Sequence, residues 1–226
     1  MENLFWIGHA SFYIKNKAGL NIFIDPFNIS EETAKNKADV ILITHAHFDH
    51  CSKKDIEKIA TQDTEIIAAP GCLSELDYKK LKIIQPNESL SVKGIEIETV
   101  PAYNIKKERV QFHPKSNNWV GYIIDVDGTK IYHAGDTDFI DEMNGLKSKN
   151  IEFALLPMGG IYTMDEEEAV EAAKAINAKF IVPMHYKNLL GKVGSERIEK
   201  ELKNKKRVNA LILKEVQEPT YSFNNR

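Results

Sequence analysis

Residues 40–52, VILITHAHFDHCS, place three histidines and an aspartate within six positions, although the whole chain of 226 residues has only seven histidines. Imidazole nitrogens and carboxylate oxygens form the kind of site that binds zinc, manganese or iron. His45 and His47 are two positions apart, so in an extended segment both rings project to the same side. Asp49 and His50 follow where the chain turns toward a predicted helix, and they can face a second point nearby. Since two-metal hydrolytic sites hold their ions about 3.5–4 Å apart, this segment can serve two ions. Capping of the strand end through backbone hydrogen bonds is the less favoured alternative.

Four apolar runs end on side chains of this kind. VILIT leads to His45, NIFI to Asp25, IYHAG to Asp136 and FIVPM to His185. In layered α/β folds, binding sites gather where loops leave the carboxyl ends of strands. We therefore expect these four strand ends to converge on one site.

The elements that must position these residues follow from the apolar patterning. Short runs of apolar and β-branched residues predict strands, at 3–9, 10–16, 20–27, 39–44, 65–71, 81–86, 95–104, 118–138 (a hairpin turning at Asp127-Gly128), 151–160 and 178–186. Helical patterns are predicted at 52–62, 73–80, 163–176 and 195–204. Ser52 and Asp55 are spaced as a helix start, and Thr163 and Glu166 as a capping box. Alternating strands and helices predict an α/β layered fold.

The composition is that of a globular protein, with 42% hydrophobic and 28% charged residues, and we expect a single domain over residues 1–226. A net charge of -3 gives no reason to expect nucleic acid or an anionic membrane as a partner. No apolar run approaches the length of a membrane span. The two cysteines, Cys51 and Cys72, cannot form a disulfide framework and suit a reducing compartment. These features predict a cytoplasmic protein.

The motif His45-x-His47-x-Asp49-His50, followed by Asp136 in AGDT and His185 in PMHY, resembles the metallo-β-lactamase superfamily across essentially the whole chain. The resemblance implies an αββα sandwich with a dinuclear site at the edge between two sheets. The segments WIGHASF, IDPF, YHAGDTD and MGGIYTM are similar to the branch that contains ascorbate-6-phosphate lactonases.

The resemblance also implies a role for each matched residue. The first metal would be bound by His45 and His47, the second by Asp49, His50 and His185, with Asp136 bridging the two ions and Asp25 orienting the motif from behind.

The third ligand of the first metal departs from the family pattern, because Asn104 stands where a histidine is usual. His113, in the same predicted loop, is the favoured replacement, and Asn104 itself or His9 are the alternatives as ligand. His9, in the GHA element, is a candidate ligand or substrate contact, and His133 a candidate neighbour of the site. Tyr186, beside His185, is a candidate substrate donor.

The chemistry implied is hydrolysis by a metal-activated hydroxide at a site of two divalent ions, with zinc or manganese favoured over iron or nickel. Asp49 and Asp136 are the candidate catalytic carboxylates, and Asp49 can carry a proton toward the leaving group. The expected partner is a small molecule such as an ester, a lactone or a phosphorylated metabolite. Cations in loops suited to phosphate binding are Lys106, Lys107, Arg109, Lys115 and Lys187. Two alternatives remain open at this point, a phosphodiesterase or nuclease and a non-catalytic metal-binding module, and a homo-oligomer is compatible with either.

Overall fold

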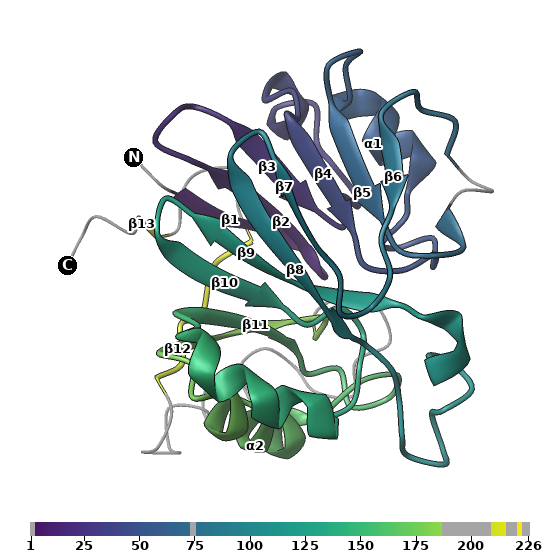
Figure 1. The fold of residues 1–226 in the computed structure, drawn as a ribbon, viewed down its shortest axis with the longest axis vertical. Coiled ribbons are helices and arrows are strands. Elements are labelled where there is room, and N and C mark those ends of the chain that lie inside the picture. The colour runs from purple at the N-terminus through teal and green to yellow at the C-terminus, as the bar shows by residue number, and fades with distance from the viewer. Residues whose placement is uncertain (1–2, 73–75, 187–208, 216–220, 223–226) are drawn as a thin grey trace.

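The apolar runs form two mixed β-sheets in the computed structural model, which describes residues 3–72, 76–186, 209–215 and 221–222 (Figure 1). The first sheet has the strand order β13 (Tyr221–Ser222), β1 (Asn3–Gly8), β2 (Ser11–Lys15), β3 (Asn21–Ile24), β4 (Val40–Ile43), β5 (Glu65–Ala68) and β6 (Leu81–Ile83). The second has the order β12 (Phe180–Met184), β11 (Phe153–Pro157), β10 (Thr129–His133), β9 (Val120–Val126), β8 (Ile95–Pro101) and β7 (Ser89–Val92).

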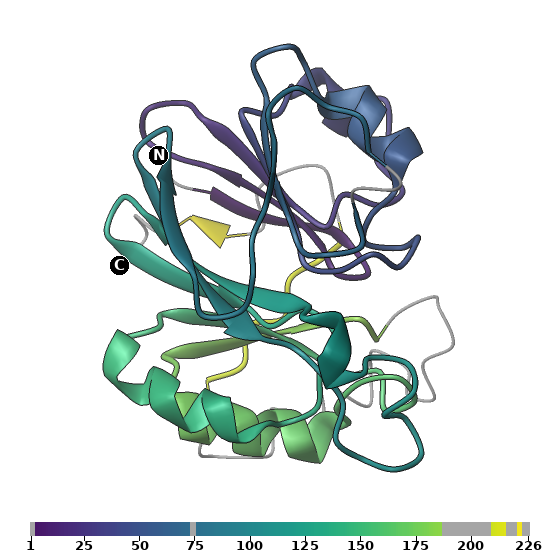
Figure 2. The same cartoon turned by 45° about the vertical axis from the view of Figure 1, so that its right-hand side comes forward.

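The two sheets pack face to face, and helical segments cover their outer faces (Figure 2). The Tyr122 hydroxyl on β9 crosses the interface and donates to the carbonyls of Ile43 (2.9 Å) and Ile67 (3.2 Å) in the first sheet. The first sheet is covered by α1 (Lys53–Ile59) and the short 3-10 helix η1 (Thr33–Lys35). The second is covered by α2 (Glu166–Ile176) and η4 (Asp141–Lys149), and η3 (Lys115–Asn117) lies in a loop. The expected αββα sandwich is therefore confirmed.

Strand direction explains why the site lies at one edge of the sandwich. β3 and β4 run parallel, as do β10, β11 and β12. β1 and β3 are both antiparallel to β2, and β8 and β10 are both antiparallel to β9. The carboxyl ends of β1, β3 and β4 thus share one edge of the first sheet, and those of β8, β10 and β12 share one edge of the second.

Several local predictions differ from the structure. The capping box of α2 is formed by Asp165 and Glu168, not by Thr163 and Glu166, because Asp165 accepts from the amides of Glu167 (3.0 Å) and Glu168 (2.9 Å) while Thr163 is fully buried. Ser52 caps α1 as expected, accepting from the amide of Asp55.

Of the short helix predicted at 73–80, residues 76–80 are not helical, and 73–75 lie outside the described residues. The helix predicted at 195–204 also lies outside them. Strand β7 was not predicted, since its sequence SLSV is short and half polar; it forms by pairing with β8.

Candidate metal centre

Three groups of potential metal ligands lie at this edge: two separate clusters, and a third group of Asp25, His45 and His50 that shares one residue with each cluster. Within each cluster, one candidate ligand atom per residue lies within 4.8 Å of the others. The first cluster consists of His45, His47 and His113, and the second of His9, Asp49, His50 and His185. They come from the loops after β1, β4, β8 and β12, as the strand directions require.

The Asp136 carboxylate lies between the two clusters. Its Oδ2 is 3.3 Å from Nε2 of His113 in the first cluster and 3.0 Å from Nε2 of His185 in the second. Its Oδ1 is 3.6 Å from Nε2 of His50. Burial opposes ionisation of Asp136, but the nearby His185 and His50 lower the pKa of its carboxyl well below the usual value. A buried carboxylate placed in this way can contact a cation on either side.

The first cluster is assembled from two segments. Nε2 of His45 and Nδ1 of His47 are 3.1 Å apart, so both nitrogens face the same point. His113 arrives from the loop after β8, where the amide of Asn104 donates to its carbonyl at 2.8 Å. The Asn104 side-chain amide donates to the carbonyls of Arg109 (2.9 Å) and Tyr162 (2.7 Å) and lies 3.0 Å from Nδ1 of His113. Asn104 therefore anchors the loop that brings His113 to the cluster.

Asp25 fixes the orientation of two rings from behind. Its Oδ2 accepts from Nδ1 of His50 at 2.7 Å and from the hydroxyl of Thr44 at 2.6 Å. The Thr44 oxygen in turn lies 2.9 Å from Nδ1 of His45, and the Thr44 amide donates to Oδ1 of Asp25 at 2.8 Å. Because Nδ1 of each ring is engaged in this way, Nε2 is the atom through which His45 and His50 would bind a metal. Thr44 was not predicted as a site residue, although it is the polar residue that directly follows VILI.

The second cluster is held by unusual backbone geometry. His9 and His185 of this cluster and the neighbouring Asp25 have φ angles of 50°, 58° and 46°, in the left-handed region that is uncommon for residues other than glycine. The His185 amide donates to the carbonyl of His9 at 3.0 Å, and the His9 ring donates through Nε2 to Oδ2 of Asp49 at 2.9 Å. Strained backbone of this kind concentrates at functional sites. It turns the His9 and His185 rings toward one another, with centroids 4.0 Å apart.

The donor set fits a metal ion. Among the described residues, several buried ring and carboxylate atoms of the two clusters have no hydrogen-bond partner. They include Nδ1 of His9, Nε2 of His50, Nε2 of His113, Nδ1 of His185 and Oδ1 of Asp136. Buried polar atoms without partners are costly, and a bound cation would satisfy those that carry a lone pair.

The titration properties agree with a cation site. Burial lowers the pKa of His45 well below its usual value, and it lowers the pKa of His47 as well, so both rings are neutral and able to ligate. Burial also opposes a charge on His50, but Asp136 and Asp25 raise its pKa well above the usual value. Burial likewise disfavours ionised Asp49, yet the hydrogen bond from His9 brings its pKa down to about 2. The carboxylates thus stabilise positive charge at the second cluster.

Two of the candidates lie away from the clusters. The His133 ring is fully buried, with Nε2 donating to the carbonyl of Ala10 (2.8 Å) and Nδ1 accepting from the amide of Gly135 (3.2 Å), so it ties β10 to the β1–β2 turn. Tyr186 is also buried, and its ring stacks on Trp6 with centroids 5.4 Å apart. Tyr186 therefore lies in the core beside the site and is not among the described residues that line the pocket, and its role as a substrate donor stays a prediction.

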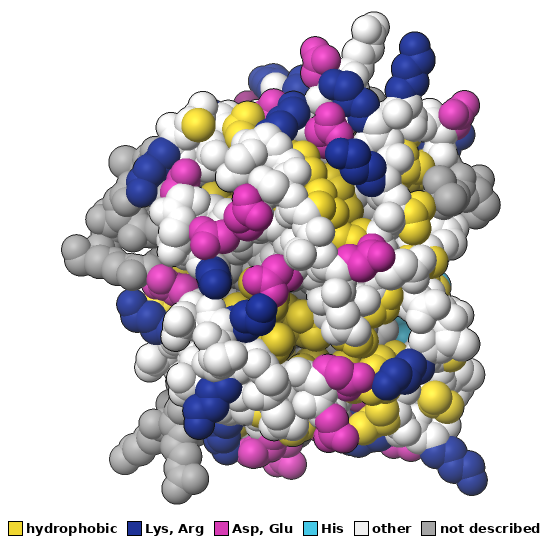
Figure 3. All heavy atoms as spheres, viewed as in Figure 1, with side chains coloured by type: hydrophobic (Ala, Val, Ile, Leu, Met, Phe, Trp, Pro, Cys, Tyr) yellow, Lys and Arg dark blue, Asp and Glu magenta, His cyan; other side chains and the backbone are white. Residues whose placement is uncertain are grey.

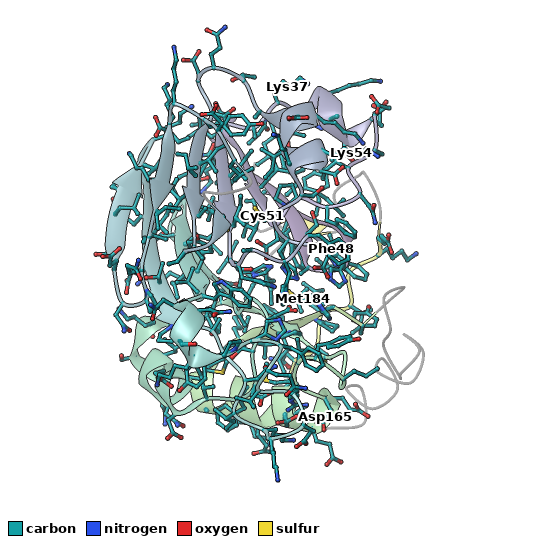
Figure 4. All side chains as sticks on the ribbon, turned by 90° about the vertical axis from the view of Figure 1, so that its right-hand side faces the viewer. Lys37, Phe48, Cys51, Lys54, Asp165 and Met184 are labelled. Atoms are coloured by element: carbon teal, nitrogen blue, oxygen red, sulfur yellow. The ribbon has the colours of Figure 1, made fainter. Side chains whose placement is uncertain are left out.

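A pocket of about 230 Å³ opens onto the clusters. It is lined by His47, Phe48, Asp49, Phe112, His113, Asp136, Tyr162 and His185. A histidine surface is visible at the right-hand edge of the space-filling view, at the junction of the two halves (Figure 3). Turning this edge toward the viewer brings Phe48 into sight above Met184, the last residue of β12 (Figure 4). Phe48 and Phe112 were not predicted, although Phe48 is an apolar residue inside the ligand motif.

Comparison with known proteins agrees with this architecture. Residues 3–185 match the Beta-lactamase superfamily domain. A UPF0173 metal-dependent hydrolase of Thermoplasma volcanium is 37% identical over 193 residues, which cover 81% of this chain and 82% of that protein. A second UPF0173 metal-dependent hydrolase, from Thermoplasma acidophilum, is 36% identical over 197 residues, which cover 82% of this chain and 84% of that protein.

Solved structures show the same fold. A Parabacteroides distasonis protein described as a metal-dependent hydrolase has a TM-score of 0.83 and 34% identity, with 95% of this chain and 93% of that chain covered. Igni18, a metallo hydrolase of Ignicoccus hospitalis, has a TM-score of 0.80 and 25% identity, with 98% of this chain and 99% of that chain covered.

No helix in the described part of the chain is long and apolar enough to cross a membrane. The ligand clusters, the sandwich and the similarity over most of the chain agree with one another. The chain belongs to the metallo-β-lactamase superfamily and, within it, to the UPF0173 family of metal-dependent hydrolases.

Proposed function

We propose that this metal-dependent hydrolase works with two divalent ions and cleaves a small carboxylic ester or lactone. The observation that carries the proposal is the position of Asp136, whose Oδ2 lies 3.3 Å from His113 and 3.0 Å from His185, one residue in each cluster. A carboxylate shared by two groups of imidazole rings is suited to bridging two metal ions.

Each cluster would hold one ion, and the donor chemistry limits which metals fit. His45, His47 and His113 would bind the first ion, Asp49, His50 and His185 the second, with Asp136 shared. Nitrogen and oxygen donors without a thiolate suit zinc or manganese, and they also accept iron or nickel. When bound, such a pair of ions lowers the pKa of a water molecule and stabilises negative charge on the attacked carbonyl oxygen.

The protein's own groups supply orientation and proton transfer. Asp25 and Thr44 hold the His45 and His50 rings with their Nε2 atoms directed at the site. Asp49 lines the pocket and accepts a hydrogen bond from Nε2 of His9 at 2.9 Å. In this proposal the Asp49 carboxylate accepts the proton released by the attacking water and passes it to the leaving group, while His9 holds the carboxylate in place.

Sequence segments, net charge, cysteine content and strand order support further parts of the proposal. The segments WIGHASF, IDPF, YHAGDTD and MGGIYTM support activity of the lactonase type. The net charge of -3 supports a small-molecule partner over nucleic acid, and the two buried cysteines suit a reducing cytoplasm. Continuous strand order in each sheet supports a single domain.

The test is hydrolysis of γ-butyrolactone and 4-nitrophenyl acetate by protein reconstituted separately with zinc and manganese. Asp136→Asn should lose at least about a hundredfold in kcat/KM, because the amide cannot serve as a charged bridge. Asp141→Asn, at an exposed carboxylate on η4, is the matched control and should retain wild-type activity. Wild-type activity in Asp136→Asn, or bound metal with no turnover of either substrate in the wild type, would contradict the proposal.

A further inference from the structure

Phe48 is an exposed aromatic residue within the metal-binding motif. It lies between His47 and Asp49, and 72% of its surface is exposed. Its ring contacts Phe27 only edge-on, with centroids 6.1 Å apart, and it forms part of the pocket lining. Exposure of a phenyl ring to water is unfavourable, and the cost is recovered when a ligand covers the ring. Phe48 is thus positioned to contact a bound molecule directly beside the metal ligands.

A second aromatic wall comes from two other loops. Phe112, directly before His113, packs against Tyr162 in a T-shaped pair with centroids 4.7 Å apart and an interplanar angle of 86°. Both rings are partly exposed and line the same pocket as Phe48. The pocket therefore combines a polar floor of histidines and aspartates with walls made of aromatic carbon.

Of the five cations in loops suited to phosphate binding, the four that the structure describes do not line this pocket. Lys106 pairs with Glu168 at 2.8 Å, and Arg109 is buried between Asp138 and Glu168 while donating to the Thr163 carbonyl.

Lys115 is also engaged, since it pairs with Glu142 at 3.0 Å. Lys107 is exposed but is not part of the lining, and Lys187 lies outside the described residues. The charged side chains in the described lining, apart from the histidines, are Asp49 and Asp136. A substrate that carries a phosphate would thus find no cationic side chain among the described lining residues.

We propose that the substrate is an ester or lactone with an uncharged aromatic or branched aliphatic substituent, and that Phe48, Phe112 and Tyr162 hold this substituent while the metal ligands face the carbonyl. This inference rests on the proposed hydrolytic function and names its substrate class. It separates the site from one that selects a phosphorylated metabolite or a nucleic-acid backbone through cationic side chains at the pocket wall.

Binding tests the inference without turnover. Isothermal titration of the metal-loaded protein would compare 3-phenylpropionate, propionate and phosphoglycolate, which share a carboxylate and differ in the attached group. We expect 3-phenylpropionate to bind about tenfold more tightly than propionate, and Phe48→Ala to remove most of that difference. Ile105→Ala, at another exposed apolar residue (57%) outside the pocket lining, is the matched control and should preserve the difference. Tighter binding of phosphoglycolate, or an unchanged preference in Phe48→Ala, would overturn the inference.

Turnover then separates this inference from the proposed function. γ-Phenyl-γ-butyrolactone, γ-butyrolactone and 6-phosphogluconolactone would be compared in an assay of proton release. Preference for the phenyl lactone, lost in Phe48→Ala, supports both proposals. Preference for the phosphorylated lactone overturns the substrate class and leaves the hydrolytic function intact. Selective binding of 3-phenylpropionate with no turnover of any lactone or ester supports the aromatic pocket and overturns the hydrolytic function.

Discussion

Replacement of Asp25 by asparagine should weaken metal binding without removing a metal ligand. Asp25 is fully buried, and its carboxylate accepts three hydrogen bonds, from the Thr44 amide (2.8 Å), the Thr44 hydroxyl (2.6 Å) and Nδ1 of His50 (2.7 Å). Asparagine tolerates the left-handed backbone found here, with φ of 46°, so the substitution introduces no new strain. The amide oxygen can keep the bond from the Thr44 amide, but the amide nitrogen cannot accept the two bonds at Oδ2.

The expected loss follows from those two bonds. Hydrogen bonds to a charged group contribute about 1.5–3 kcal/mol each, and part of that loss appears as destabilisation of the metal-free fold. Changes to residues that orient metal ligands typically reduce metal affinity about 10–100-fold. That range corresponds to about 1.4–2.7 kcal/mol of binding free energy.

Asp55→Asn provides a matched control for the loss of a buried carboxylate. Asp55 is also buried and accepts from three donors, the amides of Asn28 and Ile29 (both 3.0 Å) and the Ser52 hydroxyl (2.7 Å), but it lies on α1 and in neither ligand cluster. The assay is zinc affinity by chelator competition, with thermal unfolding of each metal-free variant measured in parallel. Both variants should lose stability, and only Asp25→Asn should lose affinity. Equal zinc affinity in Asp25→Asn and the wild type would refute the orienting role.

Two further predictions follow from the site geometry. In Gly159→Ala, the new Cβ would lie 2.8 Å from the carbonyl oxygen of His185 and 3.2 Å from its Nδ1, so His185 must move and the number of zinc ions bound per chain at a fixed free zinc concentration should fall. Gly145→Ala is the control, because the space around Gly145 is open. Equal zinc stoichiometry in the two variants would contradict the displacement of His185. In chelator-treated protein, the unfolding temperature should rise with pH up to about 6.5 and fall above it. Below about pH 6.5 the unfolded chain binds more protons than the folded chain, because burial in the folded chain lowers the pKa of several histidines. Above about pH 6.5 the folded chain binds more protons, because Asp136 and Asp25 raise the pKa of His50 against the effect of burial. The histidines with lowered pKa are His9, His45, His47 and His133. A scan of unfolding temperature from about pH 5 to pH 9 checks this profile, and a monotonic change across the range would contradict it.

The strand ends that carry ligands were predictable because the sequence shows both the strand and the ligand that follows it. An apolar run marks each strand, and a polar ligand type directly follows it, as with VILIT before His45 and FIVPM before His185. The structure places Asp25, His45, Asp136 and His185 at the same edge, as the parallel strand directions require. The layered fold was predictable for a related reason: strands that are apolar on both faces need helices or a second sheet on each face.

Features set by loops were harder to predict. His113 and Asn104 belong to one irregular segment, and only the backbone bond between them, with the side-chain contacts of Asn104, shows which of the two reaches the first cluster. Tyr186 resembled a substrate donor because it adjoins His185, but the left-handed φ of 58° at His185 leaves Tyr186 stacked on Trp6 in the core. Local sequence does not encode such turns strongly, because tertiary packing selects them.

In the proposed site the two ligand clusters hold two metal ions, with His113 as a ligand of the first. The most direct test is metal content by inductively coupled plasma mass spectrometry after zinc loading and gel filtration, in the wild type, in His113→Ala and in His133→Gln. The last variant replaces a buried histidine that bonds only to backbone groups, so it controls for loss of a ring near the site. We expect about two ions per chain in the wild type and His133→Gln, and about one in His113→Ala. Two ions in His113→Ala would remove His113 from the ligand set, and no bound metal in the wild type would contradict the dinuclear site itself.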